Sequence, residues 1–252
     1  MNRLLLNIII IGFAVCSACT TGRAQQTFRV LEYNVENFFD CKHDTLKNDY
    51  EYLPGSLRGW NWTRFQDKRN KIAKVILAAS DEQVPDVVVL CEVENAACME
   101  SLTRFSPLKD AAYRYVMTDS PDERGIDVAL MYQPATFRLI GKNHIRIPAT
   151  EGRKPTRDIL HVTGRVVSGD TIDFIACHLP SRAGGKQTAP YRWKVARTLR
   201  TIADSVQSAR SHPHLIILGD FNDTPSSPTL SEALGAQAPA SAPAPQTFYN
   251  LM

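Results

Sequence analysis

The chain has 252 residues, of which 44% are hydrophobic and 22% are charged, a composition typical of a globular protein long enough to bury a full core. Its formal net charge is only +3, from 29 Lys and Arg against 26 Asp and Glu. This near balance excludes a protein that binds nucleic acid mainly through a positive field over the whole molecule, so any phosphate-binding site must be local.

Residues 1–24 are predicted to be an export signal rather than part of the fold. Arg3 gives a positive start, and the apolar run at 4–15 is shorter than the about 20 residues that a membrane-spanning helix needs. Two cleavage sites compete. Cys16-Ser17-Ala18-Cys19 resembles a bacterial lipobox, with Cys19 as the lipidated residue, whereas Gly22-Arg23-Ala24 suits ordinary signal peptidase. We favour the lipoprotein, and either site predicts a protein of the periplasm, outer membrane or cell surface.

Residues 25–252 are predicted to form one domain of mixed strands and helices. Apolar residues recur at helical spacing within 64–79, and the unbroken apolar run at 87–90 fits a strand covered on both faces. The strand-rich middle of the chain indicates two sheets packed face to face with helices outside, an α/β sandwich. In chain order, we expect a strand at 28–35, a helix at 64–79, a strand at 87–90, a helix at 95–105, strands at 126–132, 137–147, 159–167 and 171–177, a helix at 191–209, a strand at 215–218, a short helix after Pro228, and a loop at 236–245.

Four cysteines follow the predicted signal. Export permits disulfides, but Cys91 and Cys177 lie inside apolar, strand-like runs and are predicted to be buried free thiols. The state of Cys41 and Cys98 stays open, because sequence alone does not fix disulfide connectivity.

Four polar clusters stand just where predicted strands end. They contain Asn34 and Glu36, then Glu92, then His178, and finally Asp220 with Asn222. A polar residue after a strand is usually only a turn former or a helix cap. Four such clusters in one chain suggest a shared cleft, in which carboxylates would repel each other unless a cation lay between them. The donors are mostly oxygens, which favours Mg²⁺ or Mn²⁺ over structural zinc.

These clusters carry a family resemblance. The segments are Y-N-V-E-N-F-F-D from Tyr33, C-E-V-E-N from Cys91, R-G-I-D-V-A-L-M-Y from Arg124, H-L-P-S-R-A-G-G from His178 and G-D-F-N-D-T-P from Gly219. In this order they resemble the endonuclease/exonuclease/phosphatase family, which includes pancreatic DNase and abasic-site endonucleases. The resemblance covers nearly all of 28–228 and implies a four-layer αββα sandwich.

The resemblance also implies roles for the site residues. Glu92 matches the principal metal ligand, and Asn34 and Glu36 match the pair beside the metal and the phosphate. Asp220 matches the residue that orients or deprotonates the attacking water, and Asn222 the residue that holds the phosphate. His178 falls where DNase-like members carry a His that contacts the phosphate or the leaving group.

Other residues are weaker candidates. Ser181 falls where other members place an Asn, and Arg182 and Lys186 could contact a substrate phosphate or simply lie in a solvated loop. Arg192 is expected to be an exposed helix residue. Asp127, inside an apolar strand, is expected either to orient Arg124 or a metal-side Asn, or to be a satisfied structural residue.

We therefore interpret the chain as a Mg²⁺-dependent, exported phosphodiester hydrolase, foremost an endonuclease or exonuclease acting on nucleic acid. The alternatives are a lipid or small-molecule phosphodiesterase or phosphatase, and a surface-anchored binding module that has lost catalysis. No obligate protein partner is inferred. The family's closing Ser-Asp-His segment has no counterpart after Asn222, so we expect the 252 residues to be C-terminally incomplete, short of one or two strands, and of low activity on their own.

Overall fold

The computed structural model describes residues 27–80, 83–148, 152–240, 244 and 247–251. The predicted export signal, with Cys16 and Cys19, lies outside the described residues. Within the described ranges, no helix combines the length and the apolar character needed to cross a membrane.

Two four-stranded sheets form the centre of the molecule. The first has the order β1-β2-β4-β3, with β1 (Val30–Phe38) parallel to β2 (Val87–Val93), and with β4 (Asp127–Tyr132) antiparallel to both β2 and β3 (Arg114–Met117). The second has the order β5-β6-β7-β8. Its strands β5 (Phe137–Ile145), β6 (Ile159–Val166) and β7 (Thr171–His178) are antiparallel neighbours, and β8 (Leu215–Asp220) runs parallel to β7.

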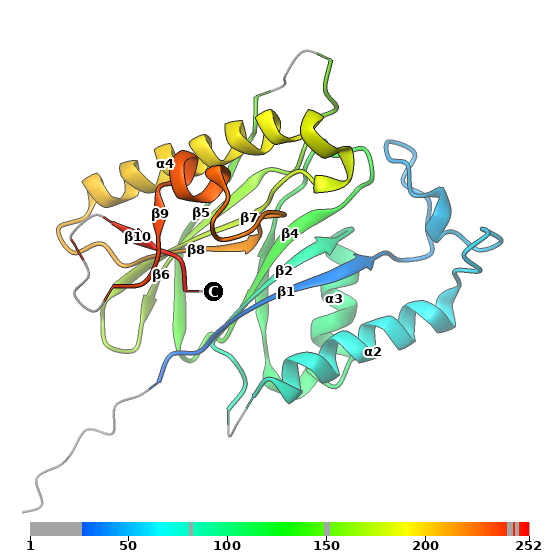
Figure 1. Cartoon of the computed structure of the whole chain (residues 1–252). Helices are drawn as coiled ribbons and strands as arrows, with labels where there is room; N and C mark the ends of the chain where they lie inside the picture. Colours follow the sequence, from blue (N-terminus) through cyan, green and yellow to red (C-terminus); the bar gives the residue numbers. More distant parts are fainter. Residues whose placement is uncertain (1–26, 81–82, 149–151, 241–243, 245–246, 252) are drawn as a thin grey trace, which may run out of the picture.

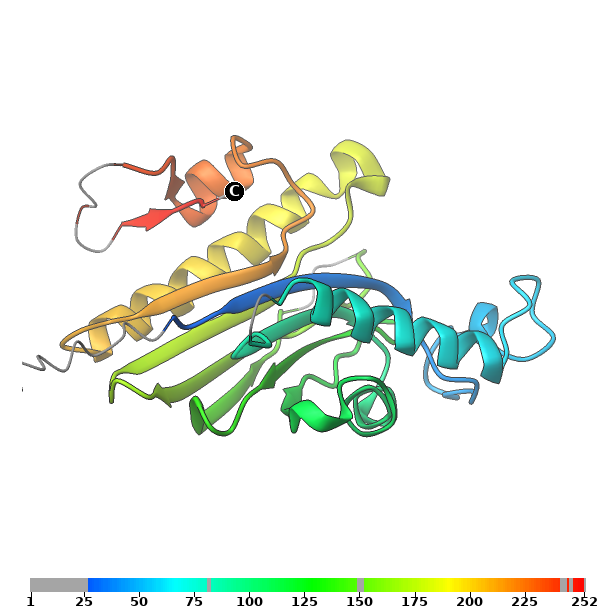
Figure 2. The ribbon, with the colours of Figure 1, turned by 90° about the horizontal axis from the view of Figure 1, so that it is seen from below.

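The sheets pack face to face and carry helices on their outer faces (Figures 1 and 2). Helices α2 (Trp62–Ala78) and α3 (Ala96–Phe105) cover the first sheet, and α4 (Ala189–Ala209) covers the second. The result is the four-layer αββα sandwich that the sequence predicts.

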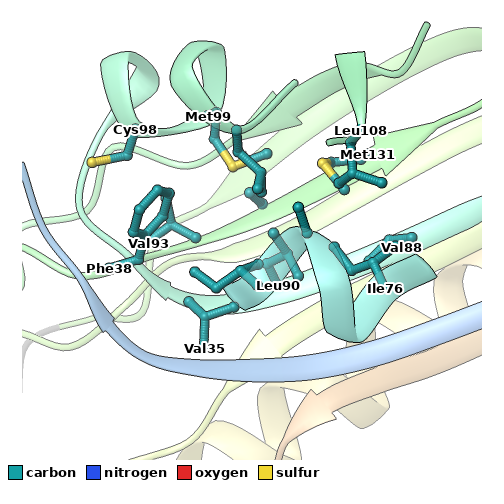
Figure 3. Packing of buried hydrophobic residues seen from close by; sticks show 14 of the residues in the cluster. Val35, Phe38, Ile76, Val88, Leu90, Val93, Cys98, Met99, Leu108 and Met131 are labelled. Atoms are coloured by element: carbon teal, nitrogen blue, oxygen red, sulfur yellow. The ribbon is translucent and has the colours of Figure 1, made fainter. Parts of the chain in front are cut away.

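Alternation along the strands explains the three hydrophobic layers. In β2, Val88 and Leu90 point to α2 and α3, where they pack with Ile76, Met99 and the other side chains of Figure 3. Val87, Val89 and Cys91 point instead into the layer between the sheets. Because both faces of β2 are covered, its apolar run is unbroken.

Short helices and loop strands complete the fold. They are the 3₁₀ helices η1 (Tyr50–Tyr52), η2 (Lys109–Ala111) and η3 (Arg182–Gln187), the π-helical turn η4 (Thr229–Leu234), and the two-stranded pair β9 (Ala236–Gln237) and β10 (Phe248–Tyr249). The loop prediction for 236–245 is therefore wrong at its first two residues. Each pairs with a residue twelve positions further along the chain, so nothing local in the sequence indicates the pairing.

Strand β3 was also absent from the predicted elements. It is a short strand at the edge of the first sheet and pairs only with β4. Its four residues, Arg-Tyr-Val-Met, are too few to show the alternation of apolar and polar residues that marks a strand.

Cysteine burial agrees with the prediction. Cys91 and Cys177 are buried free thiols, and burial raises the pKa of each far above the ordinary value for a thiol. Cys41 and Cys98 are also free.

Strands β1 and β8 are the edge strands of their sheets and contact each other across the sandwich. Beyond β8, η4 packs on α4, with β9 and β10 beside it (Figure 2). The expectation that further strands belong to the sheets stays a prediction.

Candidate active site

The four polar clusters meet at one corner of the sandwich. In the first sheet Asn34 of β1 pairs in register with Cys91, so Glu92 lies beside it, and in the second sheet His178 pairs with Asp220. Asn34 Nδ2 donates a hydrogen bond of 2.9 Å to Asp220 Oδ2, which joins the two sheets through residues 186 positions apart in the chain.

Backbone bulges aim the acidic side chains of the first sheet. Glu36, Asn37 and Glu92 all have positive φ angles, of 53°, 66° and 67°, and the register of β1 with β2, and of β2 with β4, shifts at these positions. A bulge turns a side chain away from the regular alternation of its strand. Non-glycine residues rarely adopt this conformation, and such residues concentrate at functional sites.

Asp220 is held in a fixed orientation. Its Oδ1 accepts a hydrogen bond of 2.8 Å from the backbone N–H of Asn222, and its Oδ2 accepts the bond from Asn34. Asn222, itself at a φ of 50°, donates its amide Nδ2 to the carbonyl of Leu179 at 3.0 Å. The carboxylate predicted to handle the attacking water is thus fixed before any substrate arrives.

His178 is buried and faces the two carboxylates. Its Nε2 lies 3.7 Å from Asp220 Oδ2 and 3.9 Å from Glu92 Oε1. Its Nδ1 is buried and has no hydrogen-bond partner among the described residues. Burial lowers the pKa of His178 to about 2, and the positive charges of Arg157 and Arg124 act in the same direction. The imidazole is therefore neutral at physiological pH, and its Nε2 can serve as an uncharged hydrogen-bond donor.

The donor set suits a hard divalent cation. Glu92, with a side chain only 12% exposed, and Asp220 offer carboxylate oxygens within 3.9 Å of His178 Nε2, and Asn34 adds an amide group. Glu36 is exposed, and its backbone N–H donates to Asn34 Oδ1 at 2.9 Å. These oxygen donors are of the kind that a hard divalent cation such as Mg²⁺ or Mn²⁺ takes, and the role of Glu92 as its principal ligand stays a prediction.

A second acidic group lies nearby but does not require a cation. Oxygen and sulfur atoms of Asp40, Glu94 and Cys98, all buried, lie within 4.8 Å of one another. Burial raises the pKa of Glu94 to about 8, so this carboxyl is largely protonated at neutral pH. Its Oε2 also accepts the backbone N–H of Asp40 at 2.7 Å, and Asn95 donates to the Asp40 carboxylate at 3.2 Å. The group satisfies its own polar atoms.

Two positive residues at the site were missed by the sequence analysis. Arg157, only 8% exposed, donates to the carbonyl of Leu179 at 2.7 Å and pairs with Asp122 at 3.2 Å. It shares the Leu179 carbonyl with Asn222, so it supports the loop that follows His178. A single charged residue just before a strand carries no sequence signal of such a role.

Lys68 of α2 is the other missed residue. Burial lowers the pKa of its ammonium group, while the negative charges of Glu36 and Glu92 act to raise it, which puts Lys68 near both carboxylates.

The predicted phosphate-binding loop lies at the rim. Ser181 is the N-cap residue of η3, and its hydroxyl accepts the backbone N–H of Ala183 at 3.2 Å. Arg182 and Lys186 are exposed, and within the described part of the chain neither makes a polar contact with Glu92 or His178. Their contact with a substrate stays a prediction.

The structure corrects the expectation for Arg192. This residue is buried rather than exposed, because its guanidinium bridges Asp223 at 3.3 Å, the carbonyl of Ser181 at 3.2 Å and the Thr188 hydroxyl at 2.8 Å. It ties the loop after β7 to the loop after β8.

The structure also decides between the roles considered for Asp127. Its carboxylate accepts bonds from the Thr118 hydroxyl at 2.6 Å and the Ser120 backbone at 3.0 Å. It is a satisfied structural residue, and Arg124 contacts Asn37 and Glu92 instead.

A mixed α/β sandwich with acidic, amide and imidazole groups at the ends of its strands defines a class of metal-dependent phosphoester hydrolases. Comparison with known proteins makes the class specific. The sequence model of the Endonuclease/Exonuclease/phosphatase family matches residues 29–252, and the chain belongs to this family. A search of curated protein sequences finds no match.

Solved structures share the fold at low sequence identity. Among them is D. rerio TDP2 complexed with a single-strand DNA product, at 16% identity and a TM-score of 0.53, covering 82% of this chain and 64% of that one. The catalytic domain of human Nocturnin with bound sulfate has 21% identity and a TM-score of 0.52, covering 82% and 71%. A mannosyl-6-phosphatase from Bacteroides thetaiotaomicron has 17% identity and a TM-score of 0.57, covering 82% and 70%. The chain thus spans about two thirds of the length of these proteins.

Proposed function

We propose that this protein is an exported, Mg²⁺-dependent phosphodiester hydrolase that cleaves nucleic acid outside the cytoplasm. The observation that carries the proposal is the fixed Asp220 carboxylate, hydrogen-bonded through both of its oxygens, next to a neutral His178 and the metal-ligating candidate Glu92.

The chain's own residues supply most of the chemistry. Asp220 orients the attacking water and accepts its proton, because its two hydrogen bonds hold the carboxylate in place. Neutral His178 donates a hydrogen bond from Nε2 to the phosphoryl or leaving oxygen as negative charge develops there. Glu92, Asn34 and Glu36 would hold the cation, which when bound polarises the phosphoryl oxygen as a Lewis acid.

A positioned proton acceptor typically contributes about 10² to 10⁴ in rate. Asp220 therefore accounts for only part of catalysis. Asn222, whose side chain is fixed on Leu179, supports the phosphate without taking up a proton.

Nucleic acid is the substrate that we favour, because His178 falls where DNase-like members of the family carry a His, and a DNA-complexed TDP2 is among the structures with this fold. A small-molecule phosphatase is the second candidate, because the fold is shared with the mannosyl-6-phosphatase. Fold alone does not choose between them. Export, with lipid on Cys19 as the means of membrane attachment, belongs to the proposal on the basis of the N-terminal sequence.

The test is a substrate panel with a matched pair of variants. Plasmid DNA, RNA, sphingomyelin and a sugar phosphate are offered to the full-length protein with Mg²⁺, with Mn²⁺ and with a chelator. The Glu92→Gln variant removes the carboxylate charge at the site. Glu100→Gln removes an exposed carboxylate on α3, where the side chain is 50% exposed and pairs with Arg104.

We expect metal-dependent cleavage of DNA or RNA that Glu92→Gln abolishes and Glu100→Gln leaves unchanged. Turnover of the sugar phosphate or of sphingomyelin alone would replace the nuclease by the alternative enzyme. Metal-dependent binding of these ligands without turnover of any would instead establish a binding module.

A further inference from the structure

Arg124 stands beside the metal-ligating candidate with most of its hydrogen-bonding capacity unused. Its guanidinium Nη2 lies 3.6 Å from Glu92 Oε2 and donates to Asn37 Oδ1. The side chain is 49% exposed, and both of these polar contacts within the described residues use the same nitrogen. The N–H groups of Nε and Nη1 therefore remain to donate to phosphate oxygens.

The loop that carries Arg124 is built rigidly. The Asp122 side chain accepts the backbone N–H of Arg124 at 3.0 Å, and the Asp122 carbonyl accepts that of Gly125 at 3.1 Å. Asp122 is in turn paired with buried Arg157. Lys47 packs under Gly125 and donates to the Asp122 carbonyl at 3.1 Å. The guanidinium is thus placed by structure, with little backbone freedom left to lose on binding.

Arg124 brings a positive charge to the corner that holds Glu92 and His178. Glu92 is approached by Arg124 at 3.6 Å and by His178 at 3.9 Å. A phosphoryl group held near Glu92 and His178 would therefore lie within reach of the Arg124 guanidinium, which is half exposed to solvent.

We propose that Arg124 binds a non-bridging oxygen of the substrate's phosphoryl group and sets the preference of the site for the charge on that group. The inference rests on the proposed hydrolysis of phosphodiesters at this centre. Because Coulomb attraction grows with the charge of the ligand, Arg124 favours a doubly charged terminal phosphate more than a singly charged internal diester. It is thereby a specificity-determining residue for terminal against internal phosphates.

Two probes of different charge test the assignment. At pH 8 inorganic phosphate is mainly a dianion, whereas dimethyl phosphate is a monoanion. Their binding to the Mg²⁺-loaded protein is measured by calorimetry, which needs no turnover. The variants are Arg124→Gln and Arg124→Lys, and the control is Arg104→Gln, which removes an exposed, carboxylate-paired arginine on α3.

We expect Arg124→Gln to weaken phosphate binding by about tenfold or more, the usual range for a hydrogen bond to a charged group, and to weaken dimethyl phosphate binding by clearly less. Arg124→Lys should keep part of the phosphate affinity, because it keeps the charge but loses the additional N–H donors of the guanidinium. Equal losses for the two probes, or no loss, would overturn the inference.

Turnover separates this inference from the proposed function. Hydrolysis of bis(4-nitrophenyl) phosphate by the wild-type protein tests the function, and the calorimetric difference between the probes tests Arg124. If hydrolysis is absent while phosphate binding depends on Arg124, the proposed function fails and the binding role of Arg124 stands. If hydrolysis occurs and neither probe depends on Arg124, the inference fails and the function stands.

Discussion

Gly219, the residue before Asp220, offers a sharp test of how the fold builds the site. Its φ is +134°, a conformation that residues with a side chain rarely adopt, and a Cβ added there would lie 1.9 Å from the carbonyl oxygen of Cys177. Ordinary contact begins at 3.4 Å, so Gly219→Ala would force strand β8 about 1.5 Å away from β7. The obstacle is backbone, which cannot rotate out of the way.

The expected cost combines two effects. Backbone strain of this kind costs on the order of 1–3 kcal/mol, and overpacking of a tight interior costs typically a further 1–3 kcal/mol. We therefore expect Gly219→Ala to lower the free energy of unfolding by about 3 kcal/mol or more. For a chain of this size that corresponds to a fall in Tm of at least roughly 6 °C.

Gly141→Ala is the matched control. Gly141 is also a strand glycine, but a Cβ there meets no atom within 4 Å. The same added methyl group should leave stability unchanged, or raise it by about 0.5–1 kcal/mol by restricting the unfolded chain. Urea unfolding and thermal melts of both variants measure the difference. If Gly219→Ala unfolds with the same midpoint as Gly141→Ala, the close approach of β7 and β8 is wrong, and with it the placement of Asp220.

Three further predictions concern charge. In the wild-type protein Tm should rise with Mg²⁺ concentration as the ion binds the folded state, and Glu92→Gln should remove most of that rise; an unchanged rise would show that Glu92 is not a ligand. Arg157→Gln should lower the free energy of unfolding by about 3–5 kcal/mol, because it leaves buried Asp122 without its partner, and Arg157→Lys by less; a urea titration with equal midpoints for the wild type and both variants would contradict this. Although burial alone would raise the pKa of Asp173, hydrogen bonds from His161, Arg210 and Thr163 outweigh it and hold that pKa well below 3.8. Its stabilisation is thus complete above about pH 4 and is lost as the pH falls below that, so Asp173→Asn should destabilise strongly at pH 7 and much less at pH 2, and an equal effect at both would refute the assignment.

Much of the fold could be predicted from the sequence, because most of its strands and helices have a recognisable pattern of apolar residues within their own short segments. The apolar run of β2 and the helical spacing of α2 and α4 are properties of short stretches, and packing does not override them. The elements that escaped prediction, β3 and the β9–β10 pair, are short and depend on partners elsewhere in the chain. Their stability comes from pairing rather than from their own composition.

In the candidate site, too, some features could be predicted from local sequence and others depend on contacts between distant segments. Asn34, Glu92, His178 and Asp220 follow apolar runs, so their positions at strand ends were visible in the sequence. The positive φ angles of Glu36 and Glu92 were not, because a bulge depends on the register between strands. The sequence analysis also wrongly expected Arg192 to be exposed. The burial of its guanidinium depends on Asp223 in a different loop, which the sequence around Arg192 does not indicate.

Strand direction explains why acids and arginines converge on this corner. In the two large sheets, β1 with β2 and β7 with β8 are the parallel pairs among the described strands. The carboxyl ends of each pair therefore lie side by side, and the contacts of Asn34 with Asp220 and of His178 with Glu92 bring the two pairs to one corner.

Strands antiparallel to them must begin at that same edge. Arg124 lies in the loop before β4, which is antiparallel to β2, and Arg157 precedes β6, which is antiparallel to β7. Negative and amide groups thus come from strand ends and positive groups from strand starts. Neither arginine could be placed from the sequence without the strand order, whereas the acids needed only the end of an apolar run. The balance of charge at the site is consequently a property of topology, and it places Arg124 opposite Glu92 at the edge where a phosphate would enter.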